Sequence, residues 1–223
     1  LSLIAFNVRP LLLKRQFSSV PNTNQPVSTL NSNIKFGTRL EVDTYIRDNL
    51  ASCTKEGLCD FILKSAESSK NDKNVSFLIN HSPVIAVRIR ELASLNWNFW
   101  EISSLINSLQ HVVSNEKGGM ELLSIMTTVA GESFKNGDIM KSLQGKHIAT
   151  LLSGLQNLDS SEDETKDLLS VALLMIRDCK EVITADEISD SLYGLKGMNS
   201  NCAEVLNILS ALALRIHSCN DEF

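Results

Sequence analysis

Polar side chains with little charge recur at two matched positions in three segments of this chain. The segments are spaced first 46 and then 40 residues apart, and the side chains are Asn107 and Gln110, then Ser153 and Gln156, then Tyr193 and Lys196. Amide, hydroxyl and amine groups of this kind form hydrogen bonds with nucleic-acid base edges or with peptides. We therefore take these six residues as candidate contacts for RNA or for a protein partner.

The residue types that usually carry catalysis or hold metals are scattered along the chain. The four histidines have no histidine or cysteine partner at ligand spacing, and the five cysteines include no Cys-x-x-Cys pair. Gly118-Gly119 and the run 131–133 match neither a phosphate loop nor a nucleophile elbow, so both are predicted to be loops. We expect no enzymatic activity, no cofactor and no metal.

The composition favours a helical, acidic protein. Of 223 residues, 43% are hydrophobic and 5% aromatic, which suits packed helices better than twisted sheets. Residues 83–223 carry 11 basic and 19 acidic side chains, a balance that offers no overall electrostatic attraction for nucleic acid. No apolar run is long enough for a membrane span, and the dispersed, odd number of cysteines indicates a reducing compartment.

An internal repeat positions the candidate residues. When Ile102, Ile148 and Ile188 are aligned, a leucine follows seven residues later in each segment, and an aliphatic pair with a serine follows thirteen residues after that leucine. Within each unit the apolar positions fall at i, i+4 and i+7, which is the spacing of an amphipathic helix, and each unit contains two such patterns. The sequence therefore predicts an all-α fold, an α-solenoid of tandem two-helix repeats at the 40- to 46-residue spacing.

Capping residues predict where the helices begin. Asn98 with Glu101 and Thr184 with Glu187 have the spacing of a capping box, whereas Gln144 departs from that pattern in the middle unit. The second helices are predicted to start at matched polar residues, namely Asn115, Ser161 and Asn201. The acidic run 160–167 is interpreted as a helix start, where carboxylates face the positive end of the helix dipole.

Three further predictions concern packing. A small residue stands at the same position of each first helix (Ser108, Gly154 and Gly194), where we expect neighbouring helices to approach closely. The aromatic cluster Trp97, Phe99 and Trp100 is expected to fill the core rather than to stack on bases. The polar faces of the first helices, which include Ser103, Ser104, Ser189 and Asp190, are predicted to be exposed.

The N-terminal part divides into three predicted segments. Residues 1–19 lack acidic side chains and carry spaced basic ones, which is typical of an organelle transit peptide, although an ordinary basic tail remains an alternative. Residues 20–40 are predicted to be a disordered linker, and residues 41–96 a degenerate capping unit. That unit is predicted to have helices at 58–65 and 77–92, with Pro83 near the first turn of the second helix. Three repeats are predicted to follow within the array 97–223, at 97–131, 144–178 and 184–218.

The run 188–198 resembles the octotricopeptide-type repeat of algal organelle proteins. The likeness lies in Ile188, in Leu192 followed by the aromatic Tyr193, in Gly194-Leu195 and in Met198, and it extends over about 97–216. The resemblance implies a factor imported into a mitochondrion, or alternatively a plastid, that binds single-stranded RNA and governs its maturation, stability or translation.

Armadillo-like and HEAT-like scaffolds have comparable repeats, and they leave open a protein-interaction scaffold or a subunit of a mitochondrial assembly. A solvated surface without a ligand is a third interpretation. The arrangement of the basic side chains distinguishes RNA from protein. Lys141, Lys146, Lys196 and Arg215 would favour RNA if they gathered on the face of Gln110 and Gln156, because phosphate neutralisation supplies much of the affinity for RNA.

Overall fold

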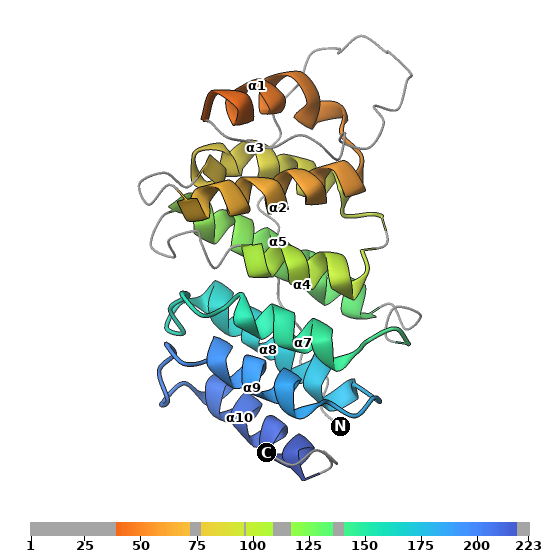
Figure 1. Cartoon of the computed structure of the whole chain (residues 1–223), viewed down its shortest axis with the longest axis vertical. Coiled ribbons are helices and arrows are strands. Elements are labelled where there is room, and N and C mark those ends of the chain that lie inside the picture. The colour runs from red at the N-terminus through yellow and green to blue at the C-terminus, as the bar shows by residue number, and fades with distance from the viewer. Residues whose placement is uncertain (1–38, 72–76, 96, 109–116, 136–140, 218–223) are drawn as a thin grey trace.

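The computed structural model describes residues 39–71, 77–95, 97–108, 117–135 and 141–217, and in these ranges the regular structure is helical, without a strand. The first half contains α1 (Arg39–Asn49), the short 3-10 turn η1 (Leu50–Ser52), α2 (Lys55–Asn71), α3 (Phe77–Leu92) and α4 (Phe99–Ser108). The second half contains α5 (Lys117–Lys135), α7 (Gly145–Ser153), α8 (Asp163–Asp178), α9 (Ala185–Gly194) and α10 (Ala203–Ile216). The all-α prediction is therefore confirmed for this part of the chain (Figure 1).

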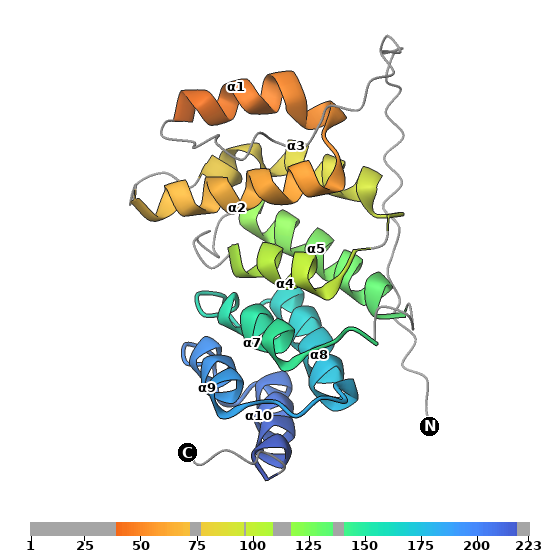
Figure 2. The same ribbon diagram turned by 45° about the vertical axis from the view of Figure 1, so that its right-hand side comes forward.

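The helices lie in two rows. In the first row α2 packs on α4, α4 on α7 and α7 on α9; in the second row α3 packs on α5, α5 on α8 and α8 on α10. Each first-row helix also contacts the second-row helix that follows it in the chain. Figures 1 and 2 show these pairs stacked one below another, with α1 at one end and α9 and α10 at the other.

The core lies between the two rows. The three aligned isoleucines, Ile102, Ile148 and Ile188, are all buried in it. They pack with the buried aliphatic positions of the second helices, such as Leu122, Leu168 and Ile208, in one continuous cluster. The amphipathic pattern in the sequence therefore predicted the buried stripe of both helices of each unit.

Both predicted capping boxes are present. At α4, Glu101 N–H donates to Asn98 Oδ1 and Asn98 N–H donates to Glu101 Oε2, each at 2.9 Å. At α9, the side chains of Thr184 and Glu187 make the same reciprocal pair of bonds. These bonds satisfy amides that a helix start would otherwise leave without a partner.

The second helices begin one residue later than predicted. The N-cap residue is Glu162 for α8 and Cys202 for α10. Ser161 and Asn201 instead belong to the preceding turn, where their N–H groups donate to the side chains of Asp159 and Asn199 at 2.8 and 2.9 Å. The acidic residues at 163 and 164 lie in the first turn of α8, as predicted, and the predicted start at Asn115 lies outside the described residues.

Two predictions about helix interruption are wrong. Gly118-Gly119 and the run 131–133 lie inside α5, not in loops. Pro83 lies inside α3 and does not open it, because the helix begins at Phe77, the start that the periodicity predicted. Buried stripes on both helices, including Leu122 and Met126 on α5 and Ile85 and Ile89 on α3, outweigh the local cost of about 1 kcal/mol per glycine and about 3 kcal/mol for a helical proline.

The predicted transit peptide at 1–19 and almost all of the predicted linker at 20–40 lie outside the described residues, so both stay predictions. The helices predicted at 58–65 and 77–92 are present as part of α2 and as the whole of α3. None of the helices in the described part of the chain is long and apolar enough to cross a membrane.

Candidate binding surface on the first row of helices

Glycines bring the first-row helices into close contact. A Cβ atom on Gly154, the C-cap residue of α7, would lie 2.5 Å from the Asn107 Cα and 2.6 Å from the Asn107 nitrogen in α4. A Cβ atom on Gly194 of α9 would overlap the Leu152 carbonyl oxygen in α7 and lie 2.7 Å from the Ser153 nitrogen. The prediction that these small residues mark close helix approach is therefore confirmed for Gly154 and Gly194.

These contacts place three of the candidate residues at one register on three successive helices. Asn107 lies at the contact with Gly154, Ser153 lies at the contact with Gly194, and Tyr193 occupies the equivalent position on α9. Asn107 and Ser153 are partly buried, whereas 55% of Tyr193 is exposed. Ser153 Oγ donates to the Asp190 carbonyl of α9 at 3.5 Å, so its hydroxyl also links two helices. We call Asn107, Ser153 and Tyr193 the register row.

The remaining candidates follow the helix ends. Gln110 lies outside the described residues, and Gln156 is partly buried in the turn after α7. Lys196 is exposed just beyond α9, and its Nζ lies 5.7 Å from the centroid of the Tyr193 ring, within the range of a cation–π contact. The structure therefore brings Tyr193 and Lys196 together as an exposed aromatic ring with an adjacent cation.

Part of the predicted polar face of α4 is buried. Ser103 and Ser104, predicted to be exposed, are 0% and 7% accessible, and the Ser103 hydroxyl donates to the Phe99 carbonyl of the preceding turn. The reason is that α4 is packed between α2 and α7 as well as on α5. Ser189 and Asp190 on α9 are exposed as predicted.

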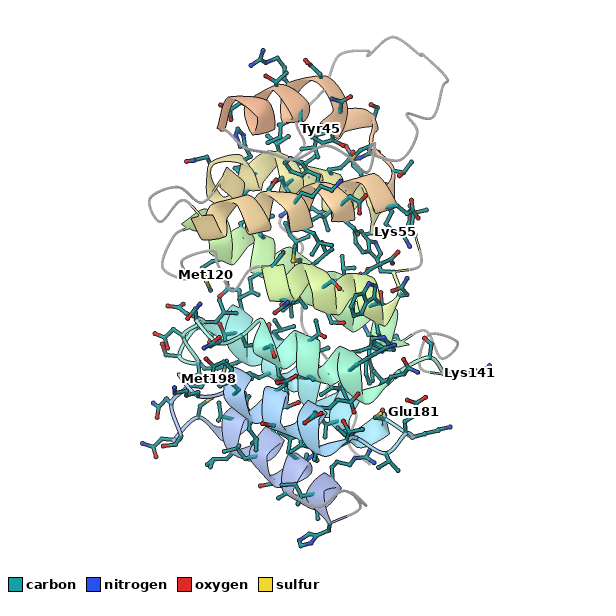
Figure 3. The ribbon with its side chains drawn as sticks, in the orientation of Figure 1. Tyr45, Lys55, Met120, Lys141, Glu181 and Met198 are labelled. Carbon is teal, nitrogen blue, oxygen red and sulfur yellow. The ribbon has the colours of Figure 1, made fainter. Side chains whose placement is uncertain are left out.

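The four basic side chains proposed as an RNA signature do not gather in one place. Arg215 donates to the carbonyl oxygens of Ile176, Arg177 and Cys179 at the carboxyl end of α8, at 2.6 to 3.1 Å. Lys146 lies in the first turn of α7, and Lys196 lies beyond the last turn of α9. Figure 3 shows Lys141 on the opposite side of the stack from Met198, which follows Lys196 by two residues in the sequence. Only Lys196 therefore lies beside the register row.

The aromatic cluster divides into core and surface. Trp97 and Phe99 are buried, as predicted, and Trp97 Nε1 donates to the Leu92 carbonyl at 3.1 Å. Trp100 differs from the prediction because 55% of it is exposed. Its ring lies edge-on to the His147 ring, with centroids 6.4 Å apart. Helix periodicity alone does not predict that Trp100 is exposed while Trp97 and Phe99 are buried, because the position of α7 determines which of these side chains is covered.

His147 occupies the capping-box position at the start of α7 that glutamate occupies in the other two units. Gln144 N–H donates to His147 Nδ1 at 3.1 Å, a bond that requires this nitrogen to be unprotonated. Burial disfavours the charged imidazolium and the nearby Lys146 charge adds to this effect, so the pKa of His147 is lowered from its usual 6.5. Sequence reasoning missed this role because histidine is not a usual residue of the capping box.

We expect this histidine to make the stability of the protein depend on pH. Since the folded-state pKa lies below the unfolded value, His147 stabilises the fold above about pH 6.5, and this contribution is lost as the pH falls through the folded pKa. Urea unfolding at about pH 7.5, 6.5 and 5.5 should show a smaller loss of unfolding free energy in His147→Gln than in the unsubstituted protein. His217→Gln, at an exposed position, is the control; equal pH slopes in all three proteins would contradict this role.

Within the described ranges, no group of three or more histidine, cysteine, aspartate or glutamate side chains is placed to hold a metal ion. A scan against models of protein families, a search of curated proteins and a search of solved structures find no match to this chain. The candidate surface is therefore defined by its own geometry.

Proposed function

We propose that this chain is an α-solenoid of two-helix repeats that binds single-stranded RNA along the register row, in a mitochondrion or plastid. The observation that carries the proposal is the register of Asn107, Ser153 and Tyr193 on α4, α7 and α9. A single strand is a periodic ligand, and repeats that each present side chains to one base are a known way to bind it. The glycine contacts support this use because they hold successive positions at a short, regular helix separation.

The chemistry of the surface suits an unpaired strand. The exposed ring of Tyr193 offers a face on which a base can stack, and the Lys196 ammonium beside it can contact a phosphate. The partly buried amide of Asn107 can form hydrogen bonds with base edges, and the Ser153 oxygen can accept one while its hydrogen is donated to the Asp190 carbonyl. We expect affinity to come from several shallow contacts, with a modest dependence on salt because few cations take part.

Fluorescence anisotropy with a pool of labelled single-stranded RNA, at about 50 and 200 mM salt, tests this proposal. We expect saturable binding that weakens at the higher salt and falls at least about tenfold in the variant Asn107→Ala/Tyr193→Ala/Lys196→Ala, since loss of one stacked base costs roughly 1–3 kcal/mol.

A matched control removes a positive charge and a hydroxyl from the second row, as Arg177→Ala/Ser210→Ala, where both side chains are exposed on α8 and α10. This control should bind RNA like the unsubstituted protein, and circular dichroism should show unchanged helicity in both variants. Equal losses in the two variants would argue that binding is a nonspecific charge effect and not a property of the register row.

A protein partner is the second candidate, and the dispersal of the basic side chains favours it. Arg215 is engaged with carbonyl groups of α8, and the chain has a net charge of −5, so little positive potential is available to attract phosphates. Absence of RNA binding at both salt concentrations would replace the RNA proposal with a protein-interaction scaffold that uses the same row of helices.

A further inference from the structure

Most positions on the surface at the α9–α10 end of the stack correspond to positions that are buried one unit earlier. Leu192 of α9 is 39% exposed, whereas Leu152, its equivalent 40 residues before in α7, is 0% exposed because α9 covers it. Ser189 is likewise exposed where its equivalent Ala149 is 5% exposed. One side of α9 is therefore exposed at positions whose equivalents in α7 are buried, and Leu192 makes this side partly apolar.

The second helix of the unit shows the same difference. Leu169 and Ile176 of α8 are fully buried, but their equivalents in α10, Leu209 and Ile216, are only partly buried. Leu206 is 49% exposed at the position that Lys166 occupies in α8. We call Ser189, Leu192, Leu206, Leu209 and Ile216 the end surface. It continues the α7–α9 and α8–α10 interfaces by one unit.

We propose that the end surface docks a helical hairpin built like α9–α10, whose first helix places a glycine against the Leu192 carbonyl. The α7–α9 interface supplies the geometry, because Gly194 meets the Leu152 carbonyl and the Ser153 nitrogen without room for a side chain. The equivalent backbone of Leu192 and Tyr193 offers the same contact to an incoming helix. A larger residue at the crossing would hold the two helices apart and leave Leu192 exposed.

The second helix of the docked hairpin would cover Leu206, Leu209 and Ile216, as α10 covers Leu169 and Ile176. Leucine at 206 in place of the lysine at 166 makes this part of the end surface more apolar than the surface that α8 presents to α10. Tyr193 would lie at this contact, as Ser153 lies at the contact with Gly194, so docking would cover part of one side chain of the register row.

The test uses the full chain carrying a second copy of residues 184–217 placed after residue 223, which preserves the 40-residue spacing. We expect amide hydrogen exchange in α9 and α10 to slow at least about tenfold, because the added hairpin covers both helices. The matched control carries Gly194→Leu in the appended copy only, and it should leave exchange at the level of the unextended chain.

Two results would overturn the proposal. One is an appended copy that is helical but leaves exchange in α9 and α10 unchanged. The other is sedimentation of the unextended chain as a dimer that Leu192→Asp and Leu206→Asp convert to a monomer, which would assign the end surface to a second copy of the chain. RNA anisotropy on the unextended chain, in which Tyr193 is exposed, reports on the register row separately, so either proposal can fail alone.

Discussion

Replacing Gly194 with leucine is expected to lower the free energy of unfolding by about 3 kcal/mol, a large share of the stability of a small domain. Any Cβ atom at this position overlaps the backbone of α7 at Leu152 and Ser153. Backbone atoms cannot move aside as a flexible side chain can, so α9 must shift away from α7. That shift would expose Leu152 and Leu155, which are fully buried.

Urea unfolding followed by circular dichroism measures this change, and a second glycine provides the control. Gly131 lies inside α5 with open space where a side chain would begin. Gly131→Ala should therefore stabilise the protein by about 0.5–1 kcal/mol, since alanine is the better helix former. If Gly194→Leu cost no more than an ordinary surface substitution, the close α7–α9 contact would be contradicted.

Replacing Trp97 with alanine is expected to cost about 3–5 kcal/mol, the range for truncating a large buried aromatic side chain. Trp97 is 1% exposed and packs near Ile89 and Ile102, where α3, α4 and α5 meet. Its indole N–H donates to the carbonyl of Leu92, the last residue of α3. The Lys55 ammonium of α2, which also pairs with Glu101, lies 5.9 Å from its ring centroid.

Trp100→Ala is the matched control because the same side chain, three residues later, is 55% exposed. We expect this variant to change the free energy of unfolding by less than about 0.5 kcal/mol. Trp97→Phe should fall between the two, since it keeps most of the apolar volume but removes one of the two donors to the Leu92 carbonyl, which retains the Leu95 N–H at 3.0 Å. Equal effects of the two alanine substitutions would show that Trp97 is not a core residue.

Local signals in the sequence predicted much of the helical structure. The capping boxes at Asn98 and Thr184 fix two helix starts through bonds between residues three positions apart, and such bonds depend little on the rest of the fold. The buried stripes followed from the 3.6-residue period. The glycine contacts followed from a repeated residue whose cost in a helix required a packing reason.

Exposure was predicted less well because it depends on neighbours distant in the sequence. Ser103 is buried and Trp100 is exposed on the same helix, and this difference depends on where α2 and α7 lie beside α4. Arg215 has the sequence character of a surface cation, yet its partners are carbonyl groups some 36 to 39 residues away. The register row followed from repeat alignment, whereas the contact between Lys196 and the Tyr193 ring depends on the conformation of the turn after α9.

The row-by-row packing has a consequence for how the chain loses its structure. The most extensive contacts of α9 and α10 are with α7 and α8, and within the described ranges none of comparable extent reaches back to α4 or α5. In such an arrangement, cooperativity passes only from one unit to the next. We therefore expect structure to be lost from the α9–α10 end first, and a pulling force applied along the stack to unfold the molecule in steps.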